Sequence, residues 1–83
     1  MIVNILYFAS LREQLGTANE QFNTDAATVG ELLDQLCARG PRWQQALCDN
    51  SHLQMAVDQT VAHRDTPLRD GAEVAFFPPV TGG

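Results

Sequence analysis

The chain has 83 residues, so it forms one domain at most, and a domain this small buries only about 60% of its unfolded surface. Its apolar share of 45% is that of an ordinary globular protein, which argues against disorder. The net charge of −5 argues against a nucleic-acid partner, because phosphates require clustered Lys and Arg.

The first predicted element is a strand from Ile2 to Phe8, an apolar run rich in β-branched and aromatic residues. Pleating divides it into one face with Val3, Ile5 and Tyr7 and an opposite face with Ile2, Asn4, Leu6 and Phe8. Because Asn4 is polar, the second face is predicted to be the less buried one.

A short helix and a weak strand follow. Ser10 and Glu13 have the spacing of a capping box, with Ser10 at the N-cap, and Gly16 ends the helix after about one turn. The polar stretch from Thr17 to Asn23, which contains Phe22, predicts a weak second strand.

The clearest element is the next helix. Thr28 and Glu31 form a second capping box, and Gly40-Pro41 terminates the segment. Between them one apolar stripe is formed by Val29, Leu32, Leu33, Leu36 and Cys37. The proline can open another short helix, in which Trp43 and Leu47 share a face.

The remaining elements are strands. Apolar and polar residues alternate from Leu53 to Asp58, and Asp58-Gln59 turns the chain into a short strand from Thr60 to Ala62. The turn signal Asp70-Gly71 precedes the last strand, Glu73 to Phe77. One main helix on one face of a mixed four- or five-stranded sheet is the economical packing, so we expect an α+β roll of the β-grasp type.

The chain is predicted to be cytoplasmic, with no membrane partner. No apolar run approaches the roughly 20 residues that span a bilayer, and the N-terminus lacks the cationic region of a signal peptide. Cys37 and Cys48 could pair, but we expect two reduced, partly buried thiols. Together with His52 and His63 they match no zinc spacing, so no metal is expected.

All the basic residues are arginines: Arg12, Arg39, Arg42, Arg64 and Arg69. Without lysine the chain has no P-loop lysine, Schiff-base lysine or lysine base. No glycine-rich phosphate loop is present, so no bound cofactor is expected, and an anionic substrate must find its cations mostly on a partner.

The chemistry is predicted to lie after the last strand. Pro78 and Pro79 cannot donate ladder hydrogen bonds, so pairing stops and the chain leaves in an extended path. The four residues that follow reach about 13 Å at about 3.3 Å each. Gly82 and Gly83 lack side chains and suit a narrow channel in another protein's active site. We therefore divide the chain into a domain, 1–79, and a Gly-Gly tail, 80–83.

The tail motif places the sequence in a known family. The stretch 70–83, Asp-Gly-Ala-Glu-Val-Ala-Phe-Phe-Pro-Pro-Val-Thr-Gly-Gly, resembles the C-terminus of the small, sulfur-carrying subunits of molybdopterin synthase, which are ubiquitin-like and ThiS-like proteins. Tyr7-Phe8-Ala9, followed by Arg12-Glu13 and Gly16, is similar to the opening of that family. Val57-Asp58-Gln59 resembles its Val-Asn-Gln turn, with Asp58 where Asn is common.

This resemblance implies a non-autonomous subunit of a sulfurtransferase. An adenylyltransferase related to ubiquitin-activating enzymes would join the Gly83 carboxyl to AMP from ATP, and a sulfur donor would convert it to a thiocarboxylate. The thiocarboxylate would donate its sulfur to cyclic pyranopterin monophosphate in the pocket of a large catalytic subunit. The implied assembly contains two small and two large subunits, and whether this chain itself counts as an enzyme stays open.

Docking on such partners needs an exposed surface. Phe8 and Phe77, with Val61 from the neighbouring strand, are predicted to form an apolar patch beside the tail. The candidate partner-binding residues are Phe8, Arg12, Val61, Phe77, Pro78, Pro79, Val80 and Thr81. Three alternatives remain: a sulfur carrier for thiamine or tRNA thiolation, a ubiquitin-like modifier, and a noncovalent binding module that shares only the fold.

Overall fold

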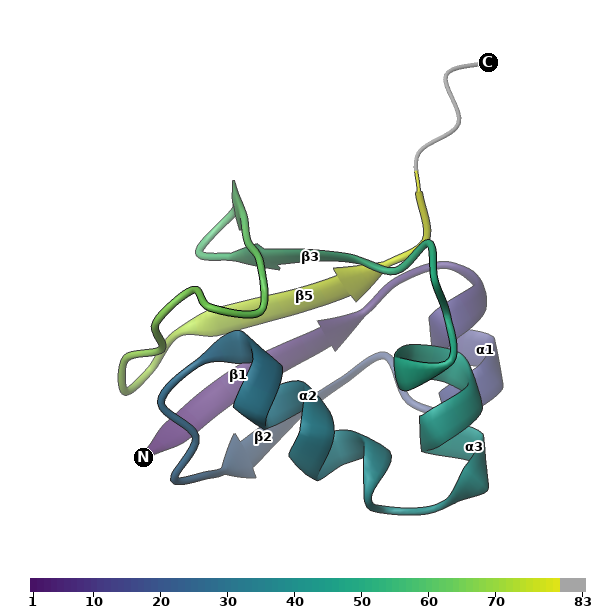
Figure 1. Ribbon diagram of the computed structural model, residues 1–83, viewed down its shortest axis with the longest axis horizontal. Coiled ribbons are helices and arrows are strands. Elements are labelled where there is room, and N and C mark those ends of the chain that lie inside the picture. Colours follow the sequence, from purple (N-terminus) through teal and green to yellow (C-terminus); the bar gives the residue numbers. More distant parts are fainter. Residues whose placement is uncertain (80–83) are drawn as a thin grey trace.

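The computed structural model describes residues 1–79 and contains one mixed sheet of five strands, in the order β2-β1-β5-β3-β4 (Figure 1). The strands are β1 (Ile2–Tyr7), β2 (Asn19–Asn23), β3 (Gln54–Val57), β4 (Thr60–Val61) and β5 (Glu73–Phe77). The helices are α1 (Ser10–Leu15), α2 (Val29–Cys37), α3 (Pro41–Trp43) and the π-helix η1 (Gln44–Cys48). This arrangement confirms the predicted β-grasp fold.

The first and last strands lie side by side in the middle of the sheet. β1 and β5 run parallel, with Ile5 opposite Val74, and their arrows point the same way in Figure 1. β2 pairs antiparallel with β1, and β3 pairs antiparallel with both β5 and β4. The chain therefore leaves the sheet from its centre, at the end of β5.

One face of this sheet is covered by helices. Val3 and Ile5 of β1 and Val74 and Phe76 of β5 have no exposed surface. They pack into one core with the apolar stripe of α2, which is buried as predicted: Val29, Leu32, Leu33, Leu36 and Cys37. Helices are confined to this side in the described residues, so the opposite face of the sheet stays open.

Only one of the two predicted capping boxes forms. At α2 the Thr28 hydroxyl accepts a hydrogen bond from the Glu31 N–H at 3.2 Å, as predicted. At α1 the N-cap is Ala9 rather than Ser10, and no side chain caps the helix. The chain enters α1 through a positive φ of 53° at Ala9, which places Ser10 inside the helix instead of at its cap.

The expectation of two free thiols is wrong, because Cys37 and Cys48 form a disulfide. Cys37 ends α2 and Cys48 ends η1, and the chain reverses between them at Gly40-Pro41. This reversal brings their Cα atoms to 6.3 Å, within the range that a disulfide spans. A spacing of 11 residues gave no local signal for this contact.

The expected lack of a membrane partner can be compared with the length and apolar character of the helices. Within residues 1–79, none of the helices has the length and apolar character needed to cross a bilayer.

Candidate functional site

The open face of the sheet carries a continuous apolar row. The strand register places Leu6 opposite Ala75, Ala75 opposite Ala56, and Ala56 opposite Val61. Side chains of directly opposed residues point to the same side of a sheet, so these four form a line across β1, β5, β3 and β4. The line ends at Val61, which is 70% exposed.

The same face is polar nearer the start of β5. There Asn4 lies opposite both Gln21 and Glu73, and Asp58 follows β3 beside Glu73. The apolar character of the open face is therefore concentrated toward the end of β5, where the chain leaves the sheet.

A shallow groove of about 590 Å³ follows this apolar region to the chain exit. Its lining comes from β1, the loop after it, the β3–β4 hairpin and β5: Leu6, Phe8, Ala9, Ala56, Gln59, Glu73, Ala75, Phe77, Pro78 and Pro79. We call this surface the exit groove. It is predominantly apolar, and its last two residues are the prolines that precede the tail.

Phe8 is fixed at the rim of the exit groove although its side chain is 48% exposed. Its N–H donates to the Phe76 carbonyl at 3.1 Å, and its own carbonyl accepts from the Leu11 N–H at 3.1 Å. A backbone held from both sides limits the positions that the ring can reach. Phe8 is therefore an anchored, exposed apolar side chain rather than a loose loop residue.

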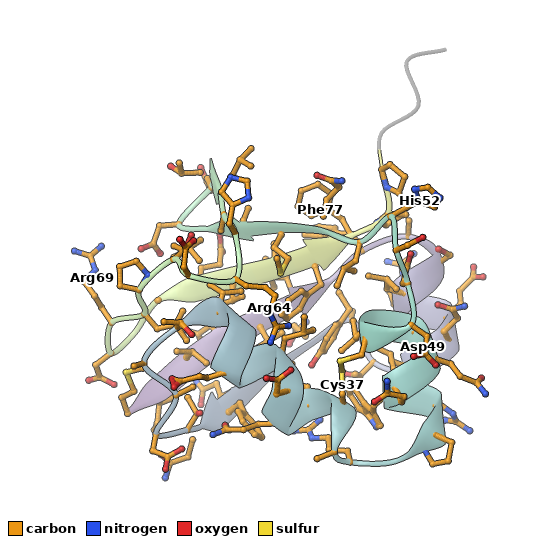
Figure 2. All side chains as sticks on the ribbon, viewed as in Figure 1. Cys37, Asp49, His52, Arg64, Arg69 and Phe77 are labelled. Carbon is orange, nitrogen blue, oxygen red and sulfur yellow. A yellow bond between two sulfur atoms is a disulfide. The ribbon has the colours of Figure 1, made fainter. Side chains whose placement is uncertain are left out.

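Phe77 and the prolines form the other end of the groove. Phe77 is half-buried and pairs with Gln54 at the last rung of the β3–β5 ladder, and Figure 2 shows it close to where the chain leaves the sheet. Pro78 is half-buried and Pro79 is exposed. Backbone pairing thus ends at the groove, and the chain emerges directly from it.

The β3–β4 hairpin, which carries Val61, is tied to the start of β5. Asp58 and Gln59 form its two-residue turn with positive φ values of 50° and 68°. The Asp58 carboxylate accepts from the Glu73 N–H at 3.0 Å and from Arg69 Nη2 at 3.2 Å. These two hydrogen bonds, the first above all, hold the pKa of Asp58 below its ordinary value.

Beneath the sheet, a charged network supports the strand that leads to Phe8. Arg39 donates two hydrogen bonds to the Glu20 carboxylate, at 2.8 and 2.9 Å, and lies over the rings of Phe22 and Trp43. The Tyr7 hydroxyl donates to the same carboxylate at 2.8 Å. Burial, followed by the hydrogen bond to Glu20, raises the pKa of Tyr7, so it stays a neutral donor.

Several predicted docking residues lie at or near the exit groove, and others do not lie on it. Phe8, Phe77, Pro78 and Pro79 line it, whereas Val61 extends the same face on β4 beyond the lining. Arg12 lies on α1, is exposed, and forms no ion pair with any residue in 1–79. The predicted residues Val80, Thr81, Gly82 and Gly83 lie outside the described residues.

Sequence reasoning missed the small residues of the groove. Ala9, Ala56 and Ala75 line it together with Leu6. The shared face of Leu6, Ala56 and Ala75 depends on strand register, which no local pattern specified. Among residues 1–79, no three His, Cys, Asp or Glu side chains gather in a way that could hold a metal ion.

The family model described as ThiS family matches residues 5–83, and the chain belongs to this family. The molybdopterin synthase sulfur carrier subunit of Escherichia coli is 46% identical over 82 residues, which cover 99% of this chain and 100% of that protein. The protein of the same name from Mycobacterium tuberculosis is 43% identical over 98% of this chain and 96% of its own length.

Other relatives carry a different name. Small archaeal modifier protein 3 of Haloferax volcanii is 33% identical, with 100% of both chains covered. The crystal structure of SAMP1 from the same organism superposes with a TM-score of 0.82 at 28% identity, over all of both chains. A chain of the Helicobacter pylori protein–protein complex of subunits 1 and 2 of molybdopterin-converting factor matches with a TM-score of 0.71 at 23% identity, also over both whole chains, and shows the shared fold.

Proposed function

We propose that this chain is the sulfur carrier subunit of a molybdopterin synthase. The observation that carries the proposal is the exit groove, an apolar surface that leads directly into Pro78 and Pro79 and then to a Gly-Gly end. Four further residues, at about 3.3 Å each when extended, give the chain a reach of about 13 Å beyond the prolines. Relatives of the same name that match over their whole length support it.

Activation is proposed to occur at the Gly83 carboxyl, on an adenylyltransferase related to ubiquitin-activating enzymes. A carboxylate oxygen of Gly83 attacks the α-phosphate of ATP and expels pyrophosphate, which gives an acyl-adenylate. Hydrosulfide supplied by a donor then attacks the acyl carbon, forms the C–S bond, expels AMP and loses its proton. The product is a thiocarboxylate, whose sulfur is a soft nucleophile.

Delivery is proposed to occur in the pocket of a large subunit. Gly82 and Gly83 present no side chain to a narrow channel, so the sulfur can reach cyclic pyranopterin monophosphate there. The phosphate of that substrate needs cations, which this acidic, lysine-free chain supplies poorly, so the large subunit binds it. Each transfer returns the Gly83 carboxylate, and since a dithiolene needs two sulfurs, the carrier cycles.

The proposed assembly contains two small and two large subunits. The solved complex of subunits 1 and 2 from Helicobacter pylori supports a large-subunit partner for a chain of this fold. The isolated chain is expected to have no turnover and to bind no cofactor or metal of its own. We place the cycle in the cytoplasm, where ATP is available for activation.

Intact-mass spectrometry tests the chemistry. The chain is incubated with the activating enzyme, ATP and a sulfur donor, and the expected product has gained the mass difference between one sulfur and one oxygen. A chain lacking Gly83 is the matched control, because it keeps the whole domain 1–79. An unchanged mass of the full chain, or equal restoration of cofactor synthesis in deficient cells by the shortened chain, overturns the proposal.

A second candidate is a protein modifier, favoured by the full-length match to small archaeal modifier protein 3. In that case Gly83 would be joined to lysines of other proteins, and the same incubation with a cell extract would yield conjugates of higher mass. A carrier for thiamine or tRNA thiolation would gain sulfur in the same way. It would copurify with the enzymes of those pathways instead of a molybdopterin synthase large subunit.

A further inference from the structure

The Cys37–Cys48 disulfide lies on the helical side of the molecule, away from the exit groove. Figure 2 shows the sulfur link among the helices, below the sheet, while Phe77 lies above the strands in the upper part of the view. Neither cysteine lines the exit groove. The disulfide therefore needs an explanation separate from the tail chemistry.

The disulfide borders a second groove, of about 610 Å³. This groove is lined by α2, the residue after it, η1, residues that precede and belong to β3, and Arg64. Both cysteines contribute to this lining, but Cys37 is only 6% exposed whereas Cys48 is half-buried. Because Cys48 is the more exposed of the two residues, we expect a thiolate in the groove to attack its sulfur first.

The segment closed by the disulfide has little regular structure of its own. It contains α3, with three residues, and η1, with five residues in the uncommon π geometry. Its backbone bonds include Gln44 N–H to Gly40 at 3.0 Å and Asp49 N–H to Gln44 at 2.8 Å. Helices this short are unstable alone, so the segment depends on its packing and on the covalent link.

The packing of this segment is anchored at several points, among them the Arg39–Glu20 ion pair and the buried Ala46. The Leu47 side chain is 1% exposed in the core, and the Trp43 ring lies edge-on to Tyr7 with centroids 5.7 Å apart. The sheet itself has a separate set of strand hydrogen bonds. Loss of the disulfide should therefore loosen residues 38–53 before it affects β1 and β5.

We propose that the Cys37–Cys48 disulfide is a thiol–disulfide exchange site, opened at Cys48 by a protein dithiol reductant. A thiolate of the reductant bonds to the sulfur of Cys48, and Cys37 leaves as a thiolate that takes up a proton. The second thiol of the reductant then attacks its own sulfur in the mixed disulfide and releases Cys48. The reductant becomes a disulfide, and the chain gains two electrons and two protons.

This inference shares the cytoplasmic setting with the proposed function but none of its chemistry, since neither the tail nor the exit groove takes part. A disulfide in a reducing compartment is usually transient or redox-sensing. The oxidised chain holds the helical segment closed, and the reduced chain releases it. The redox state of the surroundings thus sets the stability of the helical side while the docking side keeps its shape.

Thiol counting on the full chain is the first test. The chain is purified without reductant and alkylated under native conditions, before and after treatment with thioredoxin and its reducing system. Intact mass should show no alkyl group before treatment and two afterwards. Two alkyl groups before treatment, or none after treatment unless denaturant is added, overturns the proposal.

The point of entry is tested on the wild-type chain and on a pair of variants. After brief exposure to glutathione and an acid quench, peptide mapping should locate the mixed disulfide at Cys48. Cys37→Ser should then react with glutathione disulfide at least about tenfold faster than Cys48→Ser, because accessibility controls the rate. Preferential trapping at Cys37 contradicts the assigned route.

The structural consequence is tested by hydrogen exchange and thermal unfolding. Reduction should lower the melting temperature by about 10 °C or more, since closing a short loop covalently adds a few kcal/mol in a small domain. Faster exchange should be confined to residues 38–53. The double variant Cys37→Ser/Cys48→Ser is the control and should not respond to reductant. Unchanged exchange in 38–53, or equal acceleration in β1 and β5, overturns the local switch.

Discussion

The two faces of the sheet differ sharply in burial, although the same strands form both. Phe76 and Phe77 are neighbours on β5, yet Phe76 has no exposed surface in the helix-covered core and Phe77 lines the exit groove. Strand pleating sends successive side chains to opposite sides, so one short strand gives one residue to the core and the next to the surface that we propose for docking. Substitutions on β5 should therefore affect folding where the side chain faces the helices, and binding where it faces the open side of the sheet.

The largest effect is expected for Phe76→Ala. Removing a fully buried ring leaves a cavity and should lower the free energy of unfolding by about 3–5 kcal/mol. That is a large part of the roughly 5–15 kcal/mol available to a domain. Urea unfolding followed by circular dichroism measures it, and Phe77→Ala is the matched control. Equal losses for the two variants would contradict the division between the faces.

Phe77→Asp should produce the opposite pattern. Because Phe77 is half-buried at the groove, the fold should persist, while a charge in the apolar contact should weaken binding to a large subunit by about 2 kcal/mol or more, roughly thirtyfold. Titration calorimetry gives the dissociation constant, and unfolding curves check the fold. An unchanged dissociation constant in a folded variant would remove the exit groove from the proposed docking surface.

The covered face also predicts a pH dependence through Glu20. Arg39, which donates the dominant hydrogen bonds, holds the Glu20 pKa below its ordinary 4.5. A lowered folded-state pKa adds stability above pH 4.5, and this stability is lost as the pH falls through the folded value. Glu20→Gln should cost about 1 kcal/mol at pH 7 and reduce the acid sensitivity. Urea midpoints between pH 7 and pH 3 test this, and parallel curves for both proteins would refute it.

The smallest expected effect compares the two helix starts. Thr28→Ala removes the side-chain cap of α2 and should cost about 1 kcal/mol. Ser10→Ala at α1 should change stability by less than about 0.5 kcal/mol, because Ser10 provides no cap there. Differential scanning calorimetry on the pair measures the contrast. A larger loss at Ser10 would restore the capping role that the sequence suggested.

Local patterns predicted the elements whose signals lie within a few residues. The last strand was expected from Glu73 to Phe77 and has those bounds, and the Asp58-Gln59 turn forms with both φ values positive. The apolar stripe from Val29 to Cys37 also predicted α2 and its buried side. In each case the signal, whether a hydrophobic period or a turn residue, relates residues that are only a few positions apart in the sequence.

Features that depend on distant contacts were not predictable in the same way. The Cys37–Cys48 link requires the chain reversal at Gly40-Pro41, and the apolar row requires the register of four strands. Arg39 gave no sign of its position over Phe22, because that ring belongs to β2. Ser10 had the right spacing for a cap, but the positive φ of Ala9 displaced it.

β5 is the last strand in the sequence, yet it lies at the centre of the sheet, so the fold depends on the segment that is synthesised last. β5 bonds to β1 on one side and to β3 on the other, so without it the sheet separates into two hairpins with no shared ladder. Two-stranded hairpins are marginal in water. A chain truncated before Glu73 should therefore not fold into a stable but inactive domain. Proteases would remove such fragments. A folded domain therefore requires that synthesis has passed β5, the strand that leads to the end proposed to carry sulfur.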